Sequence, residues 1–158
     1  MRRNLDEQKS LVELAKATAV RAHEGQVDKL GAAYIGHPAR VAGHARALGG
    51  SPEAISTAWL HDVIEDCEVS AEDLRNSGIP ETVIEAVQLL SKRPGQSLEE
   101  YCADVRGNAL ALLVKQADLA DNTDPERTSQ LDPVTRQRLA EKYRRTRTLL
   151  GLLQQPGP

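Results

Sequence analysis

The chain has 158 residues, enough for a single domain with a hydrophobic core, and its formal net charge is -3 at pH 7. This balance excludes the basic footprint of a protein that binds nucleic acid or an anionic membrane. No run approaches the ~18 apolar residues of a membrane span, and no apolar signal-peptide segment follows the N-terminus. The two cysteines cannot form a disulfide framework, so we expect a cytoplasmic protein without nucleic-acid or membrane partners.

The first third of the chain carries signals for three helices. Apolar residues at three-to-four spacing predict a first helix over about residues 6–23. A connector that contains glycine and lysine follows at residues 25–36. Pro38 fits the first turn of a second helix, which Gly49-Gly50 ends. Ser51 is a typical N-cap residue, so a third helix is expected to start there.

Helical signals continue to the end of the chain, and no alternating strand pattern interrupts them. These elements predict an all-α fold, a compact bundle of roughly six to eight helices. Residues 1–158 are expected to form one domain. Later helix starts are expected at Ser70, Pro80, Ser97, Asn108 and Asp132, and the last helix is expected to fray at residues 154–158.

Four ionisable residues interrupt an apolar run at residues 54–66, which should be a core helix. They form two adjacent pairs, His61-Asp62 and Glu65-Asp66. Ionised side chains held away from water need a partner or a metal ion. If the helix is continuous, positions 61 and 65 share one face and positions 62 and 66 share the next. The pattern therefore predicts a polar site in apolar surroundings, formed by one imidazole and three carboxylates.

The other three histidines are candidates for further metal ligands. His37 follows a turn at a helix start, where its ring can project without blocking packing. His44 lies seven residues later on the same helix and is its rival. His23 ends the first helix and could simply favour the dipole there. Each of the three, taken alone, is more often structural than a ligand.

A second carboxylate signal is Asp118, which interrupts the apolar helix expected at residues 108–122. Asp121 and Asn122 follow one turn later. The plain interpretation is a helix end that enters solvent, because a turn follows at residues 122–125. That interpretation would hold if His61-Asp62 were absent.

A cluster of basic residues lies near the C-terminus. A solvated helix face is the usual meaning of such a cluster, and a rim that attracts phosphate is the alternative. The residues are Lys142, Arg144, Arg145 and Arg147.

His37, His61, Asp62 and Asp118 follow the ordered pattern H…HD…D of the HD phosphohydrolase superfamily. More narrowly, the chain resembles the ppGpp hydrolase domain of Rel/Spo alarmone enzymes and their small stand-alone relatives. The matched blocks span about residues 20–143. They are Ala22-His23-Glu24-Gly25-Gln26, Lys29, Tyr34-Ile35-Gly36-His37-Pro38, Leu60-His61-Asp62-Val63-Ile64-Glu65-Asp66, Val114-Lys115-Gln116-Ala117-Asp118, Asn122 and Glu141-Lys142-Tyr143.

The resemblance implies a metal-dependent hydrolase that removes the 3′-pyrophosphate of (p)ppGpp to leave GDP or GTP. It implies that one divalent ion, usually Mn²⁺, binds to the four residues of the H…HD…D pattern. Two imidazoles and two carboxylates leave open positions in an octahedral shell. Glu65 and Asp66 would then act on the attacking water and the leaving group.

The same resemblance implies contacts with a nucleotide substrate. Lys29 and Asn122 would bind it, and Tyr143 would close over it. Lys115 is either a further phosphate contact or a charge that supports the site, because it lies close in sequence to Asp118.

Two departures from the family pattern bear on substrate identity. Asp28 stands where the family commonly has an arginine that packs against the purine, and Asp121 places an extra acid before Asn122. One alternative is therefore a hydrolase of another nucleotide or of an NADPH-like metabolite. A second alternative is a regulatory module that binds a nucleotide without cleaving it. The intact pair Glu65-Asp66 argues against the second.

Overall fold

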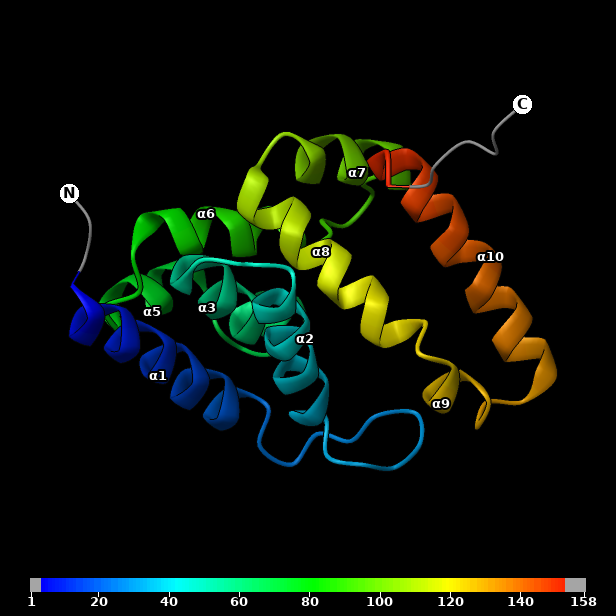
Figure 1. The fold of residues 1–158 in the computed structure, drawn as a ribbon, viewed down its shortest axis with the longest axis horizontal. Coiled ribbons are helices and arrows are strands. Elements are labelled where there is room, and N and C mark those ends of the chain that lie inside the picture. Colours follow the sequence, from blue (N-terminus) through cyan, green and yellow to red (C-terminus); the bar gives the residue numbers. More distant parts are fainter. Residues whose placement is uncertain (1–3, 153–158) are drawn as a thin grey trace.

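The structure is a computed structural model that describes residues 4–152, and these residues form an all-α fold (Figure 1). Ten helices follow one another within the described range, and two of them are single turns of four residues. Eight longer helices remain, which agrees with the predicted bundle. The helices are α1 (Leu5–Ala22), α2 (Gly36–Ala47), α3 (Pro52–Leu60), α4 (Val63–Asp66), α5 (Ala71–Asn76), α6 (Glu81–Leu90), α7 (Leu98–Arg106), α8 (Ala109–Asn122), α9 (Pro125–Thr128) and α10 (Pro133–Leu150).

Five of the predicted helix starts carry side-chain caps, and α6 begins after Pro80 without one. Ser51 accepts a hydrogen bond from the N–H of Ala54, and Asn108 accepts one from Ala111. Each cap satisfies one of the N–H groups that a helix leaves unpaired at its first turn. Ser70, Ser97 and Asp132 cap their helices in the same way. The fraying expected at residues 154–158 lies outside the described residues.

The core consists mainly of small and branched apolar side chains in two clusters. One gathers residues of α2, α3, α6, α7, α8 and α10, and the other joins α1, α3, α4, α5 and α6. Trp59 packs against both, so α3 lies between them. In Figure 1, α2 and α3 lie at the centre, with α1 on one side and α8 on the other. Within residues 4–152, no helix is long and apolar enough to cross a membrane.

The expectation of a continuous helix through residues 54–66 is wrong. Helix α3 ends at Leu60, His61 and Asp62 form a turn, and α4 begins at Val63. Consecutive residues on a continuous helix point about 100° apart. The break allows the adjacent side chains to face one site instead, with His61 Nε2 3.1 Å from Asp62 Oδ2.

Candidate active site

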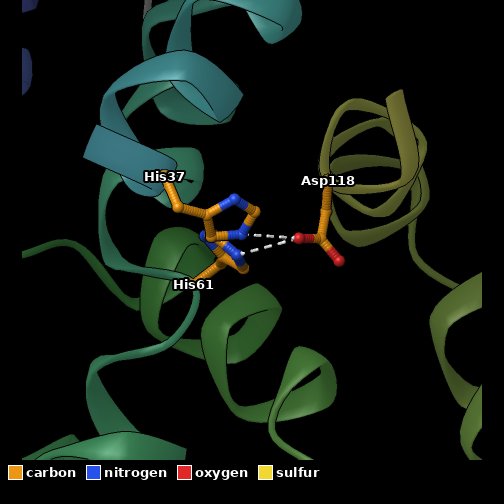
Figure 2. Close-up of side chains that lie close together, drawn as sticks. All are labelled: His37, His61 and Asp118. Carbon is orange, nitrogen blue, oxygen red and sulfur yellow. Dashed lines mark hydrogen bonds and ion pairs between the residues drawn. The ribbon is translucent and has the colours of Figure 1, made fainter. Parts of the chain in front are cut away.

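Three helices bring the predicted metal ligands together. His37 lies in the first turn of α2, His61 follows α3, and Asp118 lies on α8. Figure 2 shows Asp118 facing both imidazoles from the opposite side. Asp118 Oδ1 is 2.8 Å from His37 Nε2 and 3.4 Å from His61 Nε2. Ligand atoms of these three residues lie within 4.8 Å of one another, so they form a possible site for a divalent metal ion.

Asp62 completes the group of four. Its Oδ2 atom lies 3.1 Å from His61 Nε2 and 3.8 Å from His37 Nε2. Both imidazoles are buried, as is Asp118, whereas Asp62 is partly exposed. The structure therefore brings together all four residues that the sequence pattern nominated.

The orientation of His61 is the observation that fits a cation. Its Nδ1 lies 2.7 Å from the carbonyl oxygen of Ala58, which can only accept, so Nδ1 carries the hydrogen. A neutral ring then presents a lone pair at Nε2 toward the oxygens of Asp62 and Asp118. That buried Nε2 atom makes no hydrogen bond within the described residues. A lone pair that faces two carboxylates needs a proton or a metal ion between them.

His37 is oriented by Asp121, whose role the sequence did not reveal. Asp121 is fully buried, accepts a hydrogen bond from His37 Nδ1 at 2.6 Å and another from Arg40 Nε at 2.7 Å. Carboxylates that bind the outer nitrogen of a metal-binding imidazole fix its ring and raise its basicity. The only sequence signal was the spacing of Asp121 one turn after Asp118. Asp121 is therefore a supporting residue and not merely an extra acid beside the site.

We expect Asp121→Asn to lower the affinity for Mn²⁺ by roughly 10–100-fold, the usual cost of losing an outer partner of a metal ligand. The amide keeps the shape of the side chain but removes the charge that favours His37 as a ligand. Equilibrium dialysis followed by elemental analysis, at fixed pH, measures the affinity. Asp104→Asn is the control, because Asp104 also lies near an arginine, Arg93, but touches neither imidazole. Unchanged affinity in Asp121→Asn would contradict the assignment.

Opposite charges shift the pKa values of the four residues. Burial alone would lower the pKa of both imidazoles, but the surrounding carboxylates outweigh it and raise both values above the ordinary 6.5. The pKa of Asp118 lies well below its usual range despite burial, because Lys115 and the imidazoles favour its charged form. The pKa of Asp62 falls to about 2 for a similar reason, with His61 as the main partner. Without a metal ion, the carboxylates favour the protonated form of both imidazoles.

We expect the stability gained from Mn²⁺ to grow as the pH rises above 6.5. A raised folded-state pKa contributes stability that is complete below the ordinary pKa of histidine and is lost as the pH rises through the raised value. Metal binding requires neutral imidazoles and strengthens over the same range. Thermal unfolding in EDTA and in Mn²⁺ should therefore give a Tm difference that widens with pH. A difference that stays constant would count against this ligand set, and His44→Ala should behave as wild type.

The carboxylates of Glu65 and Asp66 lie beside the four-residue group. Glu65 Oε1 accepts a hydrogen bond from the N–H of Lys92, and Asp66 Oδ2 lies 3.4 Å from the hydroxyl of Tyr34. Ligand atoms of Asp62, Glu65 and Asp66 also lie within 4.8 Å of one another. Partial burial and the neighbouring carboxylates raise the pKa of both Glu65 and Asp66. A raised pKa suits a carboxyl group that must both accept and return a proton.

Two predicted substrate contacts bind Asp118 instead of projecting freely. Lys115 Nζ lies 3.0 Å from Asp118 Oδ2, and Asn122 Nδ2 donates to Asp118 Oδ1 at 3.2 Å. Both residues also line the cavity described next. Lys115 thus pairs with Asp118 and also lines the cavity, which is compatible with both roles that the sequence left open.

A cavity of about 460 Å³ opens beside the site. Its wall combines the carboxylates of the site with five cations and several apolar side chains. Lys29 and Tyr143, both predicted substrate contacts, lie on this wall. The cations are Lys29, Lys92, Lys115, Arg127 and Lys142.

The basic residues near the C-terminus do not share one surface, because they have different surroundings. Only Lys142 lines the cavity. Arg145 pairs with Glu99, and Arg147 donates to the hydroxyl of Thr123 at 2.9 Å. Among the described residues, His37 lies with His61 and Asp118 in the possible metal site, whereas His23 and His44 are not part of that group.

Asp28 bonds to its own loop. Its Oδ1 atom accepts hydrogen bonds from the N–H groups of Leu30 and Ala32, at 2.9 and 3.0 Å. Gly31 completes the tight turn with a φ of 83°, a conformation that favours glycine. The carboxylate therefore has a structural role, although the residue also lines the cavity.

Comparisons with known proteins agree with the motifs. The chain is 34% identical over 128 residues to a probable guanosine-3′,5′-bis(diphosphate) 3′-pyrophosphohydrolase of Synechocystis, covering 76% of the chain and 17% of that protein. It is 36% identical over 130 residues to the corresponding hydrolase of Vibrio cholerae, covering 77% of the chain and 18% of that protein. The chain thus spans less than a fifth of the length of these relatives. No protein-family model matches it.

A solved structure supports the fold. It is described as a metazoan ortholog of SpoT that hydrolyzes ppGpp, and it aligns with a TM-score of 0.75 at 20% identity. The alignment covers 89% of this chain and 85% of that one. The all-α fold expected from the sequence is confirmed. The chain is a relative of the guanosine-3′,5′-bis(diphosphate) 3′-pyrophosphohydrolases and shares its fold with the SpoT ortholog.

Proposed function

We propose that the chain is a metal-dependent phosphohydrolase that removes the 3′-pyrophosphate of (p)ppGpp and leaves GDP or GTP. The observation that carries this proposal is a buried pair of imidazoles facing Asp62 and Asp118, next to the carboxylates of Glu65 and Asp66 and a cavity lined by cations. The named activity of the relatives supports the same reaction.

His37, His61, Asp62 and Asp118 would hold one divalent ion, which we propose to be Mn²⁺. When bound, such an ion polarises a phosphoryl oxygen and makes water more acidic. The donor set suits it, because imidazole and carboxylate are ligands that first-row divalent ions accept. Asp121 and the carbonyl of Ala58 keep the two Nε2 atoms directed inward.

Glu65 and Asp66 would handle the protons of the reaction. Water attacks the phosphorus bonded to the ribose O3′ atom, that P–O bond breaks, and pyrophosphate departs. One carboxylate takes a proton from the water, and a protonated partner gives one to O3′. Burial and neighbouring carboxylates raise the pKa of both residues, which favours the protonated form that the donor of this pair needs.

The cations of the cavity would bind the phosphate groups of the nucleotide. Partial burial lowers the pKa of Lys142, and the nearby charges of Lys115, Lys29 and Lys92 lower it further. Cations that repel one another in this way gain most when a polyanion lies between them. We propose that Lys29 and Asn122 contact the nucleotide and that Tyr143 covers it.

We expect Lys142→Met to raise KM for (p)ppGpp about tenfold with little change in kcat. The loss of one charge-assisted phosphate contact, worth about 1.5 kcal/mol, corresponds to that factor. Steady-state kinetics at saturating Mn²⁺ measure it. Arg144→Met is the matched control, because Arg144 is an exposed cation on the same helix. An equal rise of KM in both variants would indicate only long-range attraction.

Asp28 favours a second candidate, a hydrolase of another nucleotide or of an NADPH-like metabolite. Its carboxylate caps a loop and cannot pack on a purine as an arginine does. A panel of ppGpp, pppGpp, other nucleotides and NADPH, assayed with Mn²⁺, separates the two candidates. Release of pyrophosphate from ppGpp supports the first, and release of phosphate or pyrophosphate only from other members of the panel rejects it. Binding without release would indicate a regulatory module.

Degradation of (p)ppGpp would give the protein a cytoplasmic role in the stringent response. Its substrate would be a small nucleotide, and the reaction needs no nucleic acid. Cell fractionation and measurement of (p)ppGpp after starvation, with and without the gene, test this placement. Unchanged (p)ppGpp levels would contradict it.

A further inference from the structure

The hydroxyl of Tyr34 lies between two carboxylates that have different proposed tasks. Its oxygen is 2.5 Å from Asp62 Oδ2 and 3.4 Å from Asp66 Oδ2. Asp62 Oδ2 is the oxygen of that residue that faces both imidazoles. A phenol has one hydrogen to donate, and the shorter distance assigns it to Asp62. The phenol oxygen can accept a hydrogen bond from Asp66 when that carboxyl group is protonated, so Tyr34 links a metal ligand to a carboxylate that would move protons. All three residues line the cavity.

The main chain around Tyr34 fixes this position. The N–H of Tyr34 donates to the carbonyl of Gln26 at 2.8 Å, and a β-bridge between Val27 and Ala33 closes the loop. The ring of Tyr34 lies between two imidazoles, with its centroid 5.0 Å from that of His23 and 5.8 Å from that of His37. Rotation of the side chain is restricted, because the ring is packed and its hydroxyl is bonded.

Gln26, the partner of Tyr34 across the loop, holds Asp66 from its other end. Its Nε2 atom donates to the carbonyl oxygen of Asp66 at 3.1 Å. Its Oε1 atom lies 2.9 Å from Nδ1 of the buried His23, which fixes the orientation of the amide. One loop therefore contacts both the main chain and the carboxylate of Asp66.

We propose that Tyr34 is a positioning residue that orients Asp62 for metal binding and Asp66 for proton transfer, while Gln26 holds the main chain of Asp66. The inference rests on the proposed function, since it assigns both carboxylates their roles. Packing alone does not require the hydroxyl, because a phenylalanine would fill the same space between the imidazoles. The hydroxyl contacts two carboxylates whose proposed roles can be measured separately. Mn²⁺ affinity reports on Asp62, and kcat reports on Asp66.

The test compares Tyr34→Phe with Gln26→Leu. Tyr34→Phe keeps the ring and removes the hydroxyl, so we expect the Mn²⁺ affinity to fall by about tenfold or more, as for other outer partners of a ligand. At saturating Mn²⁺, kcat should still be lowered with KM unchanged, because Asp66 is less well placed. Gln26→Leu touches no metal ligand and should lower kcat while the Mn²⁺ affinity stays at the wild-type value. Thr57→Val is the control for loss of a buried hydroxyl, since Thr57 bonds only the carbonyl of Glu53 on α3.

The outcomes are distinguishable. Mn²⁺ affinity is measured by dialysis without any substrate, so it tests Tyr34 even if the nucleotide panel rejects (p)ppGpp, and kcat is then measured on the substrate that the panel identifies. Wild-type Mn²⁺ affinity and wild-type kcat in Tyr34→Phe would overturn the proposal. A lower Tm with both values unchanged would also overturn it, because Tyr34 would then be a packing residue. Equal loss of Mn²⁺ affinity in Gln26→Leu would overturn the separate roles assigned to Tyr34 and Gln26.

Discussion

Glu65→Gln and Asp66→Asn should each lower kcat by ~10²–10⁴-fold, the usual contribution of general acid–base catalysis, while Mn²⁺ binding is retained. Both substitutions keep the shape of the side chain. The amide oxygen introduced at position 65 can still accept from the N–H of Lys92. The amide N–H introduced at position 66 can donate to the hydroxyl oxygen of Tyr34. The loss of activity would then reflect the missing proton transfer and not a displaced loop.

Single-turnover kinetics at saturating Mn²⁺ and substrate measure the chemical step directly. Glu85→Gln, an exposed acid on α6, is the matched control and should hydrolyse as wild type does. Either of the two variants acting at the wild-type rate would remove that residue from the mechanism.

His61→Ala should abolish stoichiometric Mn²⁺ binding and, with it, hydrolysis. Loss of a direct ligand should lower the metal affinity by more than the roughly 10–100-fold expected for loss of an outer partner. The remaining carboxylates of Asp62 and Asp118 would face each other without the imidazole that lies 3.1 and 3.4 Å from them. Elemental analysis after dialysis gives the metal content, and circular dichroism reports whether the helices are retained.

The control is His44→Ala, which removes a partly buried imidazole from α2 without touching the site. His61→Asn is the second variant, in case alanine leaves the interior too poorly filled to fold. Its amide can donate to the carbonyl of Ala58 as the imidazole does. A folded His61→Ala protein with a full complement of Mn²⁺ would disprove the ligand set.

Most of the fold could be predicted because its signals are local. Serine, asparagine and aspartate caps mark helix starts in the sequence itself, as Ser51 and Asn108 show. The break after Leu60 could not be predicted, because an apolar run has the same pattern whether or not the helix is interrupted. A local contact accompanies the break, in which the ring of His61 folds back to the carbonyl oxygen of Ala58 three residues earlier.

The candidate site, too, could be predicted from the sequence only in part. Its four proposed ligands could be nominated because they match the ordered H…HD…D pattern of the HD superfamily. Their partners could not, since Asp121 contacts His37 across 84 positions and Tyr34 contacts Asp62 across 28. Such contacts depend on how α2, α3 and α8 pack together, and a single sequence contains no direct signal of that packing.

The position of α10 affects how substitutions during evolution can alter the cavity. The proposed reaction centre lies where α2, α3 and α8 pack on one another, whereas α10 packs chiefly on α7 and supplies one side of the cavity through Leu139, Lys142, Tyr143 and Thr146. Figure 1 shows α10 at the edge of the molecule, apart from α1, α2 and α3. Inherited changes on this helix can therefore alter which molecule fits while the chemistry is conserved. Relatives can therefore differ in substrate when the cavity-lining residues of α10 change, while the residues of the proposed reaction centre stay the same.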